Sequence, residues 1–402
     1  GYSLQTLSEI ASIEQLKKND FIYQLVIQCC YKHKLCSNVI IKSSIAKSFG
    51  TLVSTIDPDI QNVTEMIKNF AKDILIPSLL ISTPQCESNY DIIMAFRDIV
   101  HYNDYTLVLG PSPFVIDSIL EFIDPQIALA YRPKERDCDL FDAIVEFFYD
   151  FFNSLSGYYH VFPNSVEVSN RFLTFFDSDD PRLHSYAIRY LGYYLWQYHT
   201  EQVPDELQCK VIEQAMKMIR EGNDYSPFLA LFYIGYYKDT VFDPYIDQLY
   251  PLFLEKLNLP FVKTQKMLLL KDNCVFALTT IADYIINKDQ EWGPGFLKSL
   301  PISLDYEDEN KMNRMYEFFF RAYCKTGLTT DYLDQFMKII IITLANPRKT
   351  VYAMNIQKFI PQIFEILHER ITPETLPLIK SQILNNDETK YKFFVDILEN
   401  GL

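Results

Sequence analysis

Glycine is scarce in this 402-residue chain, with only 11 residues, and no stretch rich in proline, glycine or serine divides it. A chain of this length would ordinarily give two or three domains, but without a linker we expect one continuous array over residues 1–402. Hydrophobic residues make up 49% of the chain and charged residues 22%. That balance supplies a continuous core and argues against disorder.

Long apolar runs are missing as well. The longest candidate, Ile339–Leu344, falls far short of the roughly 18 to 20 residues that a membrane span needs. The chain opens directly on an expected helix, Ser3–Lys17, and no signal peptide precedes it. We therefore expect a protein of the cytoplasm and nucleus.

Basic residues are fewer than acidic ones, 37 against 52, and the net charge is −15. A surface of this sign repels phosphate backbones, which makes nucleic acid a poor candidate for direct binding and basic proteins better ones. The eight cysteines are scattered through apolar helical patterns and are interpreted as reduced core thiols. They are Cys29, Cys30, Cys36, Cys86, Cys138, Cys209, Cys274 and Cys324.

Catalytic motifs are also lacking. Gly110-Pro111-Ser112-Pro113 does not have the glycines of a nucleophile elbow, and no glycine-rich phosphate loop occurs. The histidines fall singly, apart from the one in Cys29-Cys30-x-x-His33-x-x-Cys36. Because the two adjacent cysteines point about 100° apart on a helix, that group is interpreted as core thiols rather than as a zinc site. We expect no enzyme activity, no catalytic residue, no metal and no cofactor.

Helical periodicity accounts for most of what is present, and no sustained period-two alternation predicts a strand. The expected helices are 3–17, 21–31, 38–56, 60–80, 89–101, 113–131, 140–155, 166–176, from 181 onward, 206–221, 228–238, 245–258, 268–287, 332–344, 351–368 and 372–398. One expected core stripe comprises Ile41, Ile45, Phe49 and Leu52, and another comprises Leu183, Ala187, Tyr190, Tyr194 and Tyr198. The alternation of helices and short turns predicts an all-α solenoid of about eight or nine hairpins, of the HEAT/armadillo type.

Two acidic segments require interpretation. Asp177-Ser178-Asp179-Asp180 precedes Pro181 and is interpreted as a turn and helix cap rather than as a magnesium site, because no second carboxylate run faces it. The other segment contains Asp305, Glu307, Asp308 and Glu309. It is either an electronegative patch for a partner rich in lysine and arginine or a solvated loop between two helices.

Asp272 and Asn273, at the expected start of a second helix, are candidate partner-binding residues too. The other interpretation of this pair is a helix cap.

The stretch from Asp272 to Phe318 resembles the C-terminal region of the importin-β (karyopherin-β) superfamily. The likeness rests on Asp272-Asn273-x-x-x-Ala277-Leu278-x-x-Ile281, Leu297-x-x-Leu300-Pro301-Ile302, the acidic residues after them and Tyr316-x-Phe318. It extends upstream through Ala230–Gly235, Tyr245-x-x-x-Leu249-x-Pro251-Leu252 and Arg132–Arg136. The branch that it resembles most imports ribosomal proteins and histones. The acidic insertion of that branch is reduced here to Asp137, Cys138 and Asp139.

The resemblance implies a nuclear transport receptor that binds basic cargo and phenylalanine-glycine nucleoporins at the nuclear pore. It also implies cargo release under the control of Ran GTPase, mainly through a region before residue 1, so that this chain is a C-terminal part of a longer protein. A HEAT-repeat scaffold that organises a phosphatase or another multiprotein complex is the alternative. Binding to phenylalanine-glycine repeats separates the two, because only the transport receptor is expected to bind them.

Overall fold

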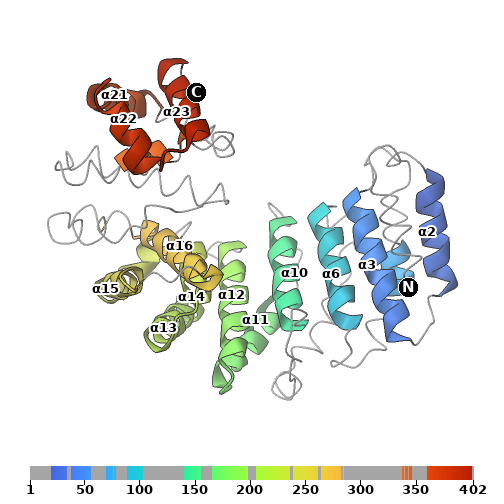
Figure 1. Ribbon diagram of the computed structural model, residues 1–402. Coiled ribbons are helices and arrows are strands. Elements are labelled where there is room, and N and C mark those ends of the chain that lie inside the picture. The colour runs from blue at the N-terminus through green and yellow to red at the C-terminus, as the bar shows by residue number, and fades with distance from the viewer. Residues whose placement is uncertain are drawn as a thin grey trace. The chain divides into compact units, whose positions relative to one another are not determined.

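The computed structural model of the chain is helical throughout the part that it describes (Figure 1). It describes residues 20–33, 38–55, 69–75, 77, 88–102, 140–154, 165–197, 205–235, 239–260, 264–281, 284, 337–338, 340–342, 344–345 and 360–400. No strand occurs within these ranges, so the all-α prediction is confirmed there. The packed helices are compatible with an α-solenoid, whereas the number and type of repeats stay predictions. The chain separates into two compact units, residues 1–214 and 215–402.

The first unit contains a row of helices in which each packs against the next. Its elements are α2 (Asp20–Lys32), α3 (Val39–Thr55), a π-helical turn (Ala71–Leu75), α6 (Ser88–Tyr102), α10 (Leu140–Ser154), α11 (Ser165–Thr174), a 3-10 turn (Phe175–Asp177) and α12 (Pro181–Gln197). α3 packs on α6, α6 on α10 and α10 on α12, and Figure 1 shows these four helices side by side. The bounds of α3, α6 and α10 lie within two residues of those predicted from periodicity, and α12 begins at the predicted Pro181.

The start of α12 shows how the local sequence sets a helix boundary. The Asp180 carboxylate accepts a hydrogen bond of 3.0 Å from the backbone N–H of Arg182. Pro181 occupies the first helical position, where its fixed φ suits the helix and its missing N–H is not needed. Ser178 Oγ accepts from the Asp180 N–H at 3.0 Å. The cap and turn interpretation of this acidic segment is therefore confirmed.

Both predicted core stripes of the first unit are buried where the structure describes them. In α3, Ile45, Phe49 and Leu52 are at most 4% exposed, and Ile41 is half-buried. In α12, Leu183, Ala187, Tyr190 and Tyr194 are buried, while Tyr198 lies outside the described residues.

Aromatic rings fill the space between α10, α11 and α12. Phe148 of α10 meets Tyr190 of α12 edge-on at 5.0 Å between ring centroids. Phe172 of α11 stacks on Tyr190 at 4.1 Å. Because all three rings are completely buried, they fix how these helices pack and hence which residues of α10 and α12 remain at the surface.

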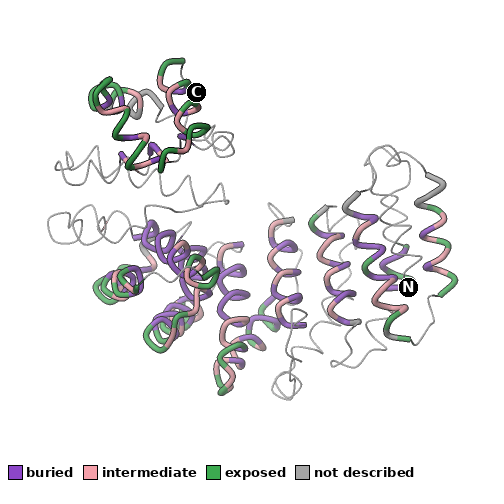
Figure 2. Tube along the Cα trace, viewed as in Figure 1, coloured by how far each residue is buried: buried purple, intermediate pink, exposed green. Residues whose placement is uncertain are grey.

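The second unit is arranged around a fully buried helix. Its elements are α14 (Ser226–Gly235), a 3-10 turn (Asp239–Phe242), α15 (Ile246–Leu257), α16 (Gln265–Thr279), α21 (Ile360–Arg370), α22 (Leu376–Leu378), a π-helical turn (Ile379–Ile383) and α23 (Glu388–Asn400). The boundary between the units falls inside α13 (Asp205–Glu221). All ten residues of α14 are buried (Figure 2), and both α14 and α15 pack against α16. Even so, no helix in the described ranges is long and apolar enough to cross a bilayer.

Two close contacts hold α16 in this unit. A Cβ on Gly235 of α14 would lie 2.4 Å from the Phe242 ring and 2.5 Å from Thr280 Cβ, so only glycine fits there. The amine of the buried Lys271 donates to the carbonyls of Leu257 and Leu259 at 2.9 and 2.8 Å. It thereby satisfies carbonyl groups at the C-terminus of α15 that have no partner within that helix.

The prediction of a single helix over residues 372–398 is wrong. The chain forms α22 and a π-helical turn, then breaks at Asn385 and Asn386, whose φ values are 52° and 59°. Asparagine tolerates this left-handed backbone better than most residues do. Asp387 then caps α23 by accepting from the N–H groups of Thr389 and Lys390, both at 3.1 Å. Apolar residues recur at helical spacing on both sides of the break, so the pattern alone predicted one uninterrupted helix.

Candidate partner-binding face

Asp272 and Asn273 lie in the interior of α16 rather than at its start, so the predicted position was wrong. α16 begins at Gln265, and its cap is Thr264, whose Oγ1 accepts from the N–H of Met267 at 3.3 Å. The cap interpretation of Asp272 and Asn273 is therefore wrong too. Asn273 is 3% exposed, and its side-chain amide donates to the Leu269 carbonyl one turn back at 2.8 Å. Asp272 is half-buried, and a partner-binding role for this pair stays a prediction.

The other predicted binding residues, Asp305, Glu307, Asp308 and Glu309, lie outside the described residues. Whether these acids form a patch for a basic partner or a solvated loop stays open.

The cysteine and histidine group at the end of α2 has the character expected of core thiols. Cys30 is completely buried, and burial, with the nearby Cys29, raises the pKa of its thiol to about 12. Cys29 is half-buried and His33 is exposed, while Cys36 lies outside the described residues. No cluster of three or more potential metal ligands occurs in the described part of the chain. A thiol this hard to ionise is a poor metal ligand at neutral pH.

The charged groups that do come together lie across α6, α10 and α12 of the first unit. Asp142, Glu146 and Asp150 follow one another at intervals of four residues and therefore share one face of α10. Like charges at this spacing repel one another. The row consequently needs cations from neighbouring helices, and α6 and α12 supply them.

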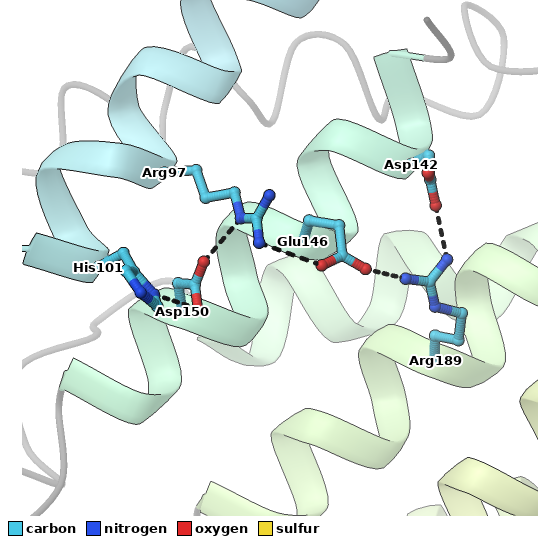
Figure 3. A network of polar contacts seen from close by, with 6 residues as sticks. All are labelled: Arg97, His101, Asp142, Glu146, Asp150 and Arg189. Carbon is cyan, nitrogen blue, oxygen red and sulfur yellow. Dashed lines mark hydrogen bonds and ion pairs between the residues drawn. The ribbon is translucent and has the colours of Figure 1, made fainter. Parts of the chain in front are cut away.

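Two arginines reach this row from opposite sides, as Figure 3 shows. From α6, Arg97 Nε donates to Asp150 Oδ2 at 2.7 Å, and its Nη2 lies 3.7 Å from Glu146 Oε2. From α12, Arg189 Nη1 donates to Asp142 Oδ1 at 2.6 Å, and its Nη2 donates to Glu146. Glu146 thus joins the two arginines, and the network connects α6, α10 and α12.

His101 completes the network one turn after Arg97 on α6. Its Nδ1 lies 3.2 Å from Asp150 Oδ1 (Figure 3). Burial alone would lower the pKa of Arg97, but the hydrogen bond and charge of Asp150 and the charge of Glu146 outweigh it and raise that pKa. The arginine therefore stays charged, as the row of carboxylates requires.

Exposure varies along the row. The side chain of Asp150 is 4% exposed and that of Arg189 is 9%, so these two groups are structural. Asp142 is 49% exposed and Glu146 is 29%. Arg189 binds only Oδ1 of Asp142, so the half-exposed Asp142 carboxylate has further lone pairs that can accept hydrogen bonds from a second cation.

A further ion pair joins α6 to α3. Asp91 of α6 pairs with Lys47 of α3 at 3.4 Å and also accepts from Ser43. Across α3, α6, α10 and α12 the acids near this row are Asp91, Asp98, Asp142, Glu146 and Asp150, against the permanent cations Lys47, Arg97 and Arg189. We call these residues, with His101, the α3–α12 face. Its acids outnumber its permanent cations, so the face retains negative charge.

Sequence reasoning did not identify the α3–α12 face. The four-residue spacing of Asp142, Glu146 and Asp150 does indicate an acidic stripe on one face of a helix. Their partners, however, are 43 to 53 residues away in sequence. Only the packing of α6 and α12 against α10 brings the arginines to the stripe.

Comparison of the chain with models of known protein families and with curated proteins gives no match.

Proposed function

We propose that this chain is a non-catalytic binding protein that holds lysine- and arginine-rich protein segments on its α3–α12 face. The single observation that carries the proposal is the α10 row. The Asp142 side chain is half-exposed and Arg189 binds only one of its carboxylate oxygens, while the Glu146 side chain beside it is 29% exposed. A basic segment lying across α10 would add charge-assisted hydrogen bonds to these carboxylates.

The net charge of −15 supports the same class of partner, because an acidic protein attracts basic segments over a distance of about one Debye length, ~8 Å at physiological salt. We further propose, from the resemblance to the importin-β superfamily, that the cargo is a ribosomal protein or a histone. The receptor would then act in the cytoplasm, in the nucleus and at the nuclear pore. Contact with phenylalanine-glycine nucleoporins and release by Ran belong to this proposal.

Asp142→Asn tests the face with little disturbance. The substitution keeps the shape of the side chain, removes one charge from a half-exposed site and leaves Glu146 to bind Arg189. The matched control is Asp177→Asn, which removes the same charge from an exposed position of the same unit that pairs with neither Arg97 nor Arg189. The assay is fluorescence anisotropy of a labelled Lys/Arg-rich peptide at several salt concentrations.

We expect Asp142→Asn to reduce the affinity for the peptide about three- to tenfold, since a charged hydrogen bond at a partly exposed site contributes roughly 1 kcal/mol. Asp177→Asn should change the affinity less than twofold. Equal losses in the two variants would mean that net charge, not the α3–α12 face, attracts the peptide.

The finer claim of a transport receptor needs a separate test. Immobilised phenylalanine-glycine repeats should retain the chain, and a peptide in which serine replaces phenylalanine should not. If neither the phenylalanine-glycine repeats nor their serine variant retains the chain, while the Lys/Arg-rich peptide still binds, the scaffold function is favoured.

A further inference from the structure

One carboxyl group of α6 is not used by the network just described. Asp98 follows Arg97 in sequence and lies between α6 and α3. A Cβ on Gly50 of α3 would be 2.3 Å from Asp98 Oδ2 and 3.4 Å from its Cγ. The carboxyl group therefore lies close against the α3 backbone at Gly50, in space that a larger side chain could enter only by displacing it.

No hydrogen bond or ion pair holds the Asp98 carboxyl in the described part of the chain. The cations nearest to it in sequence are bound elsewhere: Arg97 to Asp150 and Glu146, and His101 to Asp150. α6 packs against α3 and α10, so the charged groups of these three helices decide the electrostatic surroundings of Asp98. They are Lys42 and Lys47 of α3, Asp91, Arg97, Asp98 and His101 of α6, and Asp142, Glu146 and Asp150 of α10.

Burial is the main reason why the pKa of Asp98 rises to about 6. The charges of Arg97 and His101 lower it in part, and the charge of Asp150 raises it again. The carboxyl group consequently changes its charge between pH 5 and pH 7 while it lies against a helix backbone that offers it no donor side chain at Gly50.

We infer that Asp98 is a proton-responsive contact between α3 and α6, which closes when the carboxyl group is neutral and loosens when it ionises. A neutral carboxyl group can stay in the narrow space over Gly50, because it carries no charge whose desolvation would cost free energy. An ionised one gains free energy by moving toward water, which separates the two helices. Because Arg97 is the adjacent residue and binds Asp150 and Glu146, the contact also influences how α6 packs on α10. This device does not depend on whether the face binds a partner.

The sign of the pH effect follows from linkage. The ordinary pKa of an aspartate is 3.8, and the folded pKa is higher. The folded contact therefore binds more protons than the open one between these values, and it weakens as pH rises from about 4 to about 6 and changes little above pH 7. With a pKa of 3.8 for the open contact and about 6 for the closed one, linkage gives at most about a tenfold increase in the opening equilibrium from pH 5 to pH 7.

Hydrogen–deuterium exchange of the whole chain at pH 5, 6 and 7 tests the inference, with the intrinsic exchange rate at each pH divided out. In the wild type, protection of peptides from 39–55 and 88–102 should fall by up to about tenfold from pH 5 to pH 7. Asp98→Asn should remove most of this dependence, and Asp177→Asn should keep it. Asp98→Ala serves as a second variant if the amide does not fold.

The inference is overturned if the wild type shows no pH dependence in these two segments, or if both Asp98 variants keep it. Either result can be obtained without a peptide partner, so it leaves the proposed function untouched. Conversely, failure of peptide binding leaves the exchange result standing.

Discussion

Replacing Arg189 with methionine should destabilise the first unit by about 2–3 kcal/mol. Methionine keeps an apolar stem of similar length but removes the guanidinium that bridges Asp142 and Glu146. Each hydrogen bond to a charged group is worth roughly 1.5–3 kcal/mol, and breaking a fully buried ion pair costs roughly 3–5 kcal/mol. Here the two carboxylates are 49% and 29% exposed and can regain water, which places the expected loss below the buried-pair range.

The assay is urea unfolding followed by tryptophan fluorescence. The chain has two tryptophans, and Trp196 lies two turns after Arg189 on α12, so a Trp292→Phe background makes Trp196 the reporter. Arg182→Met is the matched control on the same helix. Arg182 pairs with Asp180 at 2.6 Å, but both side chains are substantially exposed, at 49% and 28%. This surface pair should contribute less than about 1 kcal/mol.

The reasoning is refuted if Arg189→Met loses no more stability than Arg182→Met. That outcome would mean that the aromatic core between α10 and α12 holds these helices without help from the ion pairs.

Two further predictions concern helix contacts. Gly235→Ala should destabilise the second unit by about 1–3 kcal/mol, because its Cβ would overlap the Phe242 ring, and thermal unfolding measures the loss. Gly50→Ala should destabilise less than Gly235→Ala does, because its Cβ would overlap only the end of the flexible Asp98 side chain, and Asp98→Ala should remove this cost in the double variant. A double-mutant cycle in which the two changes simply add would contradict the contact between these residues.

Local signals predicted the helices well where a boundary had its own chemistry. Asp180 followed by Pro181 marks the start of α12, and the structure places both residues in those roles. The same logic failed at Asp272 and Asn273, since residues that often cap helices can also lie inside one. There the amide of Asn273 bonds to a carbonyl of its own helix, and packing decides the outcome.

The α3–α12 face shows where sequence reasoning reached its limit. The acidic stripe on α10 follows from a local spacing of four residues, but its meaning depends on Arg97 and Arg189. Those residues arrive through the packing of aromatic rings such as Phe148 against Tyr190. Likewise, the close approach of Asp98 to Gly50 depends on the register between α3 and α6, which no pattern within either helix specifies.

The most direct test of the central claim is to locate the bound peptide. A Lys/Arg-rich peptide carrying a photoreactive group can be cross-linked to the whole chain and the attachment sites mapped by mass spectrometry. We predict attachment in residues 140–154 and 181–197, with competition by unlabelled peptide and a reduction in Asp142→Asn. Attachment confined to other segments, including residues 305–309, would contradict the assignment of binding to the α3–α12 face.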